Sequence, residues 1–375
     1  MDSRAIVLSE TILTKNRNLK EVAMSAAKMK AAVYKKPGLI QIEDRPLPYL
    51  QLPTDAIVRV TLATICSSDI HIKHGFVPKA VPDTILGHEF VGVVEQIGSQ
   101  VKTVRPGDRV AVNVETFCGQ CWFCRRGFVN NCSHPDGGWA LGCRIDGGQA
   151  EYVRIPFADN GLTKIPHEVS DESALFTGDL LSTGYWAADM AEIKSEDTVA
   201  VIGAGPTGLC SMMCAALYQP KRIIAIDTCQ ERLNLAKRQG LAQTVINPDR
   251  ENVSQTVLNL TKGRGADCVL EVAGKENTFQ MAWSIARPNA VVCVVAMYEK
   301  DQILPLPQMY GKNLIFKTGG VDACRCAEIL QLIQQGRLNT SCLITHRLPF
   351  DQIMKGYEIF ENKLDGVIKI AVQVS

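Results

Sequence analysis

The stretch VAVIGAGPTGLC, residues 199–210, joins an apolar run to a glycine-rich turn and the start of a helix-like segment. Gly203, Gly205 and Gly208 form the pattern GxGxxG within it. After a strand, these glycines allow a tight turn, close backbone approach to a pyrophosphate, and amide donors at a helix N-terminus. The motif alone is weak evidence, but its position between a strand and a helix predicts a dinucleotide-binding turn.

The next apolar run, RIIAI, is followed directly by Asp227. A carboxylate about 20 residues beyond the glycine turn accepts hydrogen bonds from the adenosine ribose hydroxyls and disfavours a 2′-phosphate. Asp227 therefore favours NAD over NADP. Arg232 lies five residues further on, and an arginine there could accommodate a phosphate, so NADP is the less favoured alternative.

The pattern of apolar residues differs between the two sides of this turn. From residue 29 to about 180, short apolar runs are cut by Gly and Pro, which predicts a β-rich, barrel-like domain. From about residue 181, apolar strands alternate with helical patterns, which predicts βαβ units and a parallel sheet. The expected fold class is α/β, with a β-rich domain beside a doubly wound coenzyme domain.

Composition limits the function classes. The chain has 375 residues with 40 basic and 39 acidic side chains, so nothing in its charge points to nucleic acid or an anionic membrane. No run reaches the roughly 20 apolar residues of a membrane span. Fourteen cysteines without a signal-peptide pattern favour a reducing, cytoplasmic compartment. Residues 1–28 are expected to be an N-terminal extension, and organelle targeting is the alternative to a simple tail.

Four cysteines lie within fifteen residues as CxxCxxCx7C. We name the segment of about residues 115–135 the cysteine lobe; its cysteines are Cys118, Cys121, Cys124 and Cys132. Thiolates at this spacing can surround one tetrahedral zinc and leave no open position. Iron–sulfur ligation is the main rival. A closed site of this kind has a structural role, so the chemistry must lie elsewhere.

A second metal site is suggested by the segments ICSSDIH and GHEF, which contain Cys66 and His88. A thiolate and an imidazole could form half of an open zinc site, completed by a distant carboxylate and a solvent or substrate oxygen. Both residues are also common in protein cores, so the spacing alone leaves this question open.

Several motifs together resemble the zinc-containing alcohol dehydrogenases of the medium-chain dehydrogenase/reductase superfamily. The motifs are CSSDIH at 66–71, GHExxGx5GxxV at 87–101, PGDRV at 106–110, the cysteine lobe, and GAGPTG at 203–208. The resemblance covers residues 29–375. It implies a GroES-like catalytic domain, residues 29–180 and 318–375, interrupted by a Rossmann NAD-binding domain, residues 181–317.

The resemblance also implies roles for single residues. Cys66, His88 and Asp179 would hold the catalytic zinc, giving two zincs per chain, and Glu89 would be a carboxylate able to bind the metal in exchange. Asp179 stands where many family members have Cys, which is similar to secondary alcohol dehydrogenases and glutathione-independent formaldehyde dehydrogenases. The resemblance further implies that Ser68 contacts the substrate oxygen and that His71 relays its proton. It places Thr183 near the nicotinamide and Trp139 in the substrate pocket.

The resulting hypothesis is a zinc-dependent enzyme that interconverts alcohols with aldehydes or ketones using NAD, as a homotetramer or a dimer. Polyol or formaldehyde oxidation is the alternative within the same superfamily. A non-enzymatic NAD(P)H-binding relative is the remote alternative, which the presence of Cys66, His88 and Asp179 disfavours.

Overall fold

Six parallel strands form one sheet, in the order β13-β12-β11-β14-β15-β16. The computed structural model describes residues 27–322 and 325–375. Its strands β11 and β12 are buried along almost their whole length, as expected for a parallel sheet covered on both faces. The strands are β11 (Thr198–Ile202), β12 (Arg222–Ile226), β13 (Thr244–Ile246), β14 (Ala266–Glu271), β15 (Ala286–Val294) and β16 (Ile315–Thr318).

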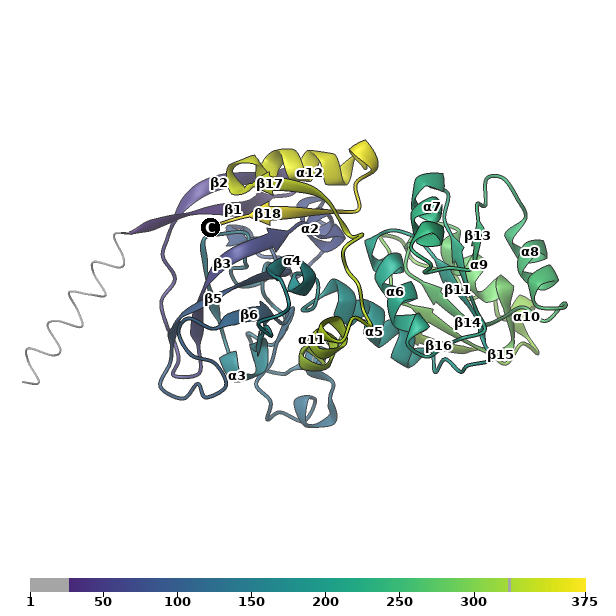
Figure 1. The fold of residues 1–375 in the computed structure, drawn as a ribbon, viewed down its shortest axis with the longest axis horizontal. Coiled ribbons are helices and arrows are strands. Elements are labelled where there is room, and N and C mark those ends of the chain that lie inside the picture. The colour runs from purple at the N-terminus through teal and green to yellow at the C-terminus, as the bar shows by residue number, and fades with distance from the viewer. Residues whose placement is uncertain (1–26, 323–324) are drawn as a thin grey trace, which may run out of the picture.

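Helices connect these strands and cover the sheet (Figure 1). They are α6 (Pro206–Ala216), α7 (Gln230–Arg238), α8 (Val253–Leu260), α9 (Thr278–Ile285) and the short α10 (Leu306–Met309). The chain runs from β11 outward to β13 and then returns to the other side of β11 at β14. Ligands of such sheets bind beyond the carboxyl ends of the strands at this reversal. The glycine turn after β11 lies there.

The second body is β-rich. Its largest sheet has the order β10-β6-β5-β3-β18-β17, with β9 also paired to β3. These strands are β3 (Ala56–Thr64), β5 (Phe90–Ile97), β6 (Arg109–Val112), β9 (Tyr152–Ile155), β10 (Leu162–Lys164), β17 (Ile344–Pro349) and β18 (Lys369–Gln373). Because β18 pairs with β3, the end of the chain returns to this body.

Smaller elements complete the β-rich body. A three-stranded sheet contains β1 (Lys28–Lys36), β2 (Leu39–Pro46) and β4 (Thr84–Ile85), and a two-stranded sheet contains β7 (Glu115–Thr116) and β8 (Gly138–Trp139). The remaining α-helices of residues 27–322 and 325–375 are α2 (Ser67–Lys73), α3 (Ala158–Gly161), α4 (Asp171–Ala174), α5 (Leu180–Met190), α11 (Cys326–Gln334) and α12 (Ile353–Glu361). Four short 3-10 turns are η1 (Cys124–Arg126), η2 (Val129–Asn131), η3 (Phe350–Gln352) and η4 (Leu364–Gly366).

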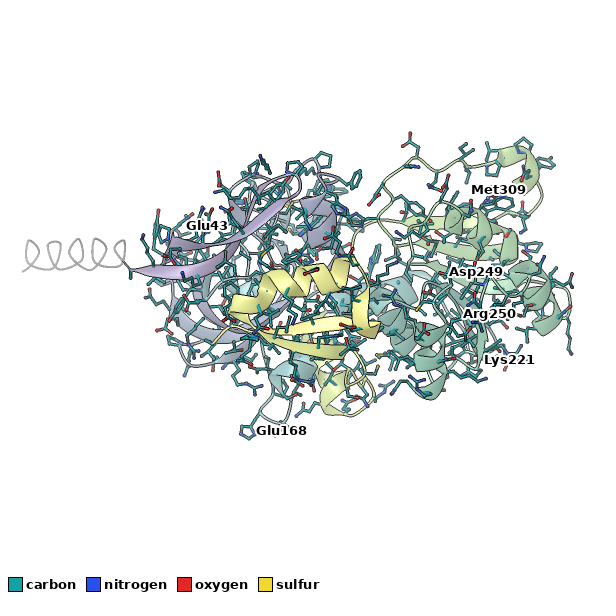
Figure 2. The ribbon with its side chains drawn as sticks, turned by 90° about the horizontal axis from the view of Figure 1, so that it is seen from above. Glu43, Glu168, Lys221, Asp249, Arg250 and Met309 are labelled. Carbon is teal, nitrogen blue, oxygen red and sulfur yellow. The ribbon has the colours of Figure 1, made fainter. Side chains whose placement is uncertain are left out.

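The helices α5 and α6 join the two bodies at the centre of the molecule (Figure 1). Gly184 of α5 faces α6 so closely that a Cβ there would lie 2.6 Å from the backbone carbon of Cys210. Seen from above, the two bodies lie side by side, with Glu43 and Glu168 on one and Lys221 and Met309 on the other (Figure 2).

The expected α/β fold class, with a β-rich domain beside a doubly wound parallel sheet, is confirmed. The extension expected at residues 1–28 lies outside the described residues up to residue 26, while Lys28 already belongs to β1. Within the described part of the chain, no helix is long and apolar enough to cross a membrane.

Candidate active site

Cys66 lies where β3 ends and α2 begins. Its backbone N–H donates a hydrogen bond to Oδ2 of Asp69 at 2.9 Å, which satisfies a donor at the start of the helix. The helix is anchored by Ile72, which is fully buried in the β-rich body. These contacts hold the Cys66 sulfur, itself almost completely buried, at a defined position.

His88 follows a turn that only glycine can make. Gly87 has a φ of +95°, and a Cβ there would lie 2.5 Å from the side chain of Gln149. The turn joins β4 to β5 and directs the His88 ring into the interior, where the residue is 1% exposed. The glycine before His88 therefore permits the backbone turn that places the histidine ring.

Three potential ligand atoms from distant segments converge at one point. Asp179 precedes α5, and its Oδ2 lies 3.6 Å from Sγ of Cys66 and 3.3 Å from Nε2 of His88. All three ligand atoms lie within 4.8 Å of one another. The structure thus brings together the three residues predicted to hold the catalytic metal.

The electrostatics of this cluster favour a positive charge at its centre. Burial opposes protonation of His88, but the carboxylates of Asp69 and Asp179 raise its pKa well above the usual value. Burial likewise opposes ionisation of Asp179, but hydrogen bonding to His88 lowers its pKa. A sulfur, an imidazole nitrogen and a carboxylate oxygen fit a catalytic zinc, which takes three protein ligands and keeps a fourth position open.

A second layer of side chains orients His88. Oδ1 of Asp69 lies 3.3 Å from Nδ1 of His88, so Nε2 is the nitrogen left to face Asp179. Gln149 donates to Oδ2 of Asp69 at 3.1 Å, and the hydroxyl of Tyr357 donates to Gln149 at 2.6 Å. No sequence pattern predicted these roles. The one available signal was the position of Asp69, three residues after Cys66 in the motif CSSDIH.

Glu89 lies beside this cluster but outside the converging ligand atoms. Its carboxylate is 1% exposed and forms an ion pair with the equally buried Lys369 of β18. Burial raises the pKa of Glu89 to about 7, and the charge of Lys369 opposes that shift. Its expected role as an exchangeable zinc ligand stays a prediction. Lys369 was missed, although a lysine within the apolar run GVIKIAVQV was a visible anomaly.

The cysteine lobe brings its four sulfur atoms within 4.8 Å of one another. Sγ of Cys121 lies 3.4 Å from that of Cys124, and Sγ of Cys118 lies 3.6 Å from that of Cys132. Gly137 lacks a side chain where a Cβ would lie 2.6 Å from the Cys132 sulfur. The lobe is therefore packed around its sulfur atoms.

The charges of the cysteine lobe suit a cation. Backbone hydrogen bonds, above all from the amide of Cys124, lower the pKa of the Cys121 thiol to about 5. Burial and the neighbouring thiol of Cys121 raise the pKa of Cys124 to about 12. Four thiolates at this spacing would repel one another without a cation between them. The donor set fits one structural zinc.

A cleft of about 1380 Å³ separates the two bodies and is lined by both. Cys66, His88 and Asp179 lie on one side, and Gly203 and Asp227 lie on the other. The volume exceeds the several hundred Å³ of a typical small-ligand pocket. It is sufficient for a dinucleotide together with a small substrate.

Four further predicted residues line this cleft near the metal cluster. Ser68 Oγ lies 3.9 Å from Sγ of Cys66. Thr183 Oγ1 lies 3.5 Å from Oδ1 of Asp179. The ring of Trp139 meets that of His88 edge to face, with centroids 5.6 Å apart. These three side chains form the wall beside the ligand atoms.

His71, the fourth of these residues, reaches across the cleft. Its Nδ1 lies 3.2 Å from Oε1 of Glu299, which belongs to the segment after β15 in the other body. Burial lowers the pKa of His71, and the carboxylate of Glu299 opposes that shift. Glu299 is 44% exposed at its side chain, so the pair connects the cleft to solvent. Sequence analysis gave no sign of this partner.

The glycine turn has the geometry expected of a phosphate-binding site. Gly203 has a φ of +106°, and a Cβ at Gly208 would lie 1.8 Å from the carbonyl oxygen of Gly203. Oδ2 of Asp227 accepts the backbone N–H of Ala204 at 2.7 Å, which ties β12 to the turn. Arg232 places Nη1 3.3 Å from the Cβ position of Gly205. A guanidinium therefore stands beside the turn.

Comparisons with known proteins agree with this arrangement. Residues 52–167 match the family model described as alcohol dehydrogenase GroES-like domain, and residues 206–334 match the model described as zinc-binding dehydrogenase. The chain is 37% identical to an alcohol dehydrogenase of Cupriavidus necator, with 92% of this chain and 99% of that protein covered. It is 32% identical to the NADP-dependent isopropanol dehydrogenase of Thermoanaerobacter brockii, with 90% and 96% covered.

A solved structure gives the same result. The alcohol dehydrogenase TADH from Thermus sp. ATN1 superposes with a TM-score of 0.85 at 36% identity, covering 92% of this chain and all of that one. With this coverage, the similarity extends over both bodies.

Proposed function

The chain belongs to the zinc-type alcohol dehydrogenases of the medium-chain dehydrogenase/reductase superfamily, and from this premise we propose that it oxidises primary or secondary alcohols with NAD, reversibly, to aldehydes or ketones. The observation that carries the proposal is the convergence of Cys66, His88 and Asp179 on one wall of a cleft whose opposite wall holds the glycine turn. A substrate group bound at this cluster would face a nicotinamide held by the glycine turn, which supports the proposal.

Cys66, His88 and Asp179 would hold a zinc, which would supply Lewis-acid stabilisation of negative charge on the substrate oxygen. The chain provides the rest. Ser68 lies close enough to the cluster to hydrogen-bond that oxygen and accept its proton. His71 then takes the proton toward Glu299 and solvent. The near-complete burial of the ligand residues limits the access of water to the cluster.

The coenzyme preference is proposed from Asp227. Its carboxylate lies at the end of β12, lines the cleft, and is where the adenosine ribose of a dinucleotide binds in this fold. A negative charge there repels a 2′-phosphate, whereas the nearby Arg232 would attract one. We expect Asp227→Gly to relax the preference toward NADP. Unchanged discrimination between NAD and NADP, measured as the ratio of kcat/KM values, would contradict the assignment.

The substrate is proposed to be a small alcohol, because the ring of Trp139 makes the wall beside the ligand atoms apolar. Polyol or formaldehyde oxidation is the alternative. Steady-state rates for primary, secondary and polyol substrates, each with NAD and NADP, distinguish these cases. A zinc count of two per chain should accompany activity, and one zinc with full activity would refute the metal assignment.

We further propose a homo-oligomer, a tetramer or a dimer, in the cytoplasm. The large side chains of Ile303, Leu306 and Tyr310 are 81%, 64% and 94% exposed beside the edge strand β16, where a second copy could cover them. The thirteen cysteines in the described part of the chain are free thiols, which suits a reducing compartment. Light scattering of the purified protein tests the assembly.

A further inference from the structure

A single buried lysine touches the chain next to two of the three ligand residues. Lys369 of β18 is 1% exposed, and its ammonium group donates to the backbone carbonyl of Ile65 at 3.0 Å. The same group donates to Oε2 of Glu89. Ile65 directly precedes Cys66, and Glu89 directly follows His88. The lysine therefore connects two ligand-bearing segments that are far apart in sequence.

Glu89 extends this connection to the third segment. Its other oxygen, Oε1, accepts the backbone N–H of Leu180 at 3.3 Å. Leu180 directly follows Asp179 and is the first residue of α5. A continuous series of polar contacts thus runs from Ile65 through Lys369 and Glu89 to Leu180, passing one residue away from every ligand.

We propose that Lys369 and Glu89 form a clamp that holds the three ligand-bearing segments at metal-binding spacing before the metal arrives. Both are positioning residues, because they act through Cys66, His88 and Asp179. The inference rests on the proposed function, since it takes those three residues as the zinc ligands. It assigns Glu89 to the clamp, in which Lys369 and the backbone N–H of Leu180 each engage one of its carboxylate oxygens.

Stability alone does not account for this pair. A buried ion pair costs desolvation energy that its attraction often only repays, and apolar replacements are frequently no less stable. Apart from its polar partners, the ammonium group is flanked by two aromatic rings, with Nζ of Lys369 lying 5.9 Å from the ring centroids of both Phe176 and Phe360. Methionine could fill such a space. What an apolar side chain cannot do is bind a carbonyl and a carboxylate on two different segments at once.

The charges also suit a role next to a metal. Burial opposes the charge of Lys369, but Glu89 and the other anions nearby raise its pKa, so the ammonium persists. Preorganised ligands bind a metal more tightly, because the ordering of three separate segments is completed during folding.

The decisive variant is the double substitution Lys369→Met with Glu89→Gln, which removes the clamp without changing the net charge of the site. Zinc release from the holoenzyme to an excess of chelator is followed over time. The cysteine lobe provides the internal control, because its zinc should leave at the wild-type rate. Release of the zinc held by Cys66, His88 and Asp179 is expected to be about 10- to 100-fold faster than in the wild type, because groups that support metal ligands typically contribute that factor.

Two milder variants keep the test decisive if the double variant does not fold. Glu89→Asp retains the charge but is too short to reach Lys369 and Leu180 together, so it should also accelerate release of the second zinc. Asp55→Glu, at a buried ion pair with Arg154 elsewhere in the same body, is the matched control and should not. Wild-type release from folded Glu89→Asp or double-variant protein would overturn the clamp alone. A wild-type chain with a single zinc would overturn both the clamp and the proposed function.

Discussion

The two metal sites of this molecule are built in opposite ways. The cysteine lobe takes all four sulfurs from fifteen consecutive residues, and three of its four cysteines are partly exposed. The cleft cluster takes its ligands from positions 66, 88 and 179, all nearly buried and supported by further buried side chains. A local site can form as soon as the metal binds, whereas an assembled site requires the fold first. The lobe should therefore govern stability, and the cleft cluster should govern turnover.

The largest effect is expected from Asp179→Ala, which removes one ligand of the cleft cluster. Loss of metal there should lower kcat by roughly 10³-fold or more, because Lewis-acid stabilisation is worth several kcal/mol. The zinc content should fall from two to one per chain, and NADH should still bind. Activity assays, metal analysis and NADH fluorescence check these points. Full activity with one zinc would contradict the claim that the cleft cluster governs turnover.

A smaller loss is expected from Asp69→Asn, which alters the partner of His88 and leaves the ligands in place. A carboxylate that fixes a ligating imidazole typically contributes about 10- to 100-fold in metal affinity or activity. Zinc titration of the apoenzyme and kcat measure this effect. An equal loss of zinc affinity at the cysteine lobe would show that the variant had disturbed the whole fold instead.

Cys121→Ser should give the opposite pattern to Asp179→Ala. One zinc is again lost, but here from the lobe, whose metal contributes to folding. We expect a Tm lower by several degrees and kcat within about threefold of wild type at a temperature where the variant is folded, since single destabilisations of about 1–3 kcal/mol leave most of a domain folded. Calorimetry and low-temperature kinetics test this. A loss of kcat as large as that of Asp179→Ala would contradict a purely structural role for the lobe.

The smallest effect is expected from the pair of His71 and Glu299, which links the cleft cluster to solvent and has no counterpart at the cysteine lobe. Burial lowers the pKa of His71, and Glu299 opposes that shift. Glu299→Gln should therefore lower this pKa further, since the remaining charged neighbours, Lys275 and His74, act in the same direction. The proton-accepting form would then persist at lower pH, and the acid limb of alcohol oxidation should move to lower pH. Profiles of kcat/KM against pH test this, with the exposed Asp301→Asn as control.

The same contrast explains what could be predicted from the sequence. The cysteine lobe and the glycine turn are local patterns, so spacing alone revealed them. The grouping of Cys66 and His88 with Asp179 needed a family resemblance, because no spacing rule connects residues 91 positions apart. Lys369, Gln149 and Glu299 escaped prediction altogether. Each acts through a partner brought to it by tertiary folding, and a lone lysine, glutamine or glutamate carries no local pattern.

The close contact between α5 and α6 links the two halves of the chemistry. Asp179 stands at the start of α5, and the glycine turn leads directly into α6. Where Gly184 meets Cys210 there is no room for even one additional methyl group. The helix that begins at a predicted metal ligand and the helix that follows the predicted phosphate-binding turn therefore pack together as one rigid pair. Because the atoms that a side chain at position 184 would meet belong to the backbone of Cys210 and Ser211, no substitution in α6 could make room for it, and we expect glycine at this position among related sequences.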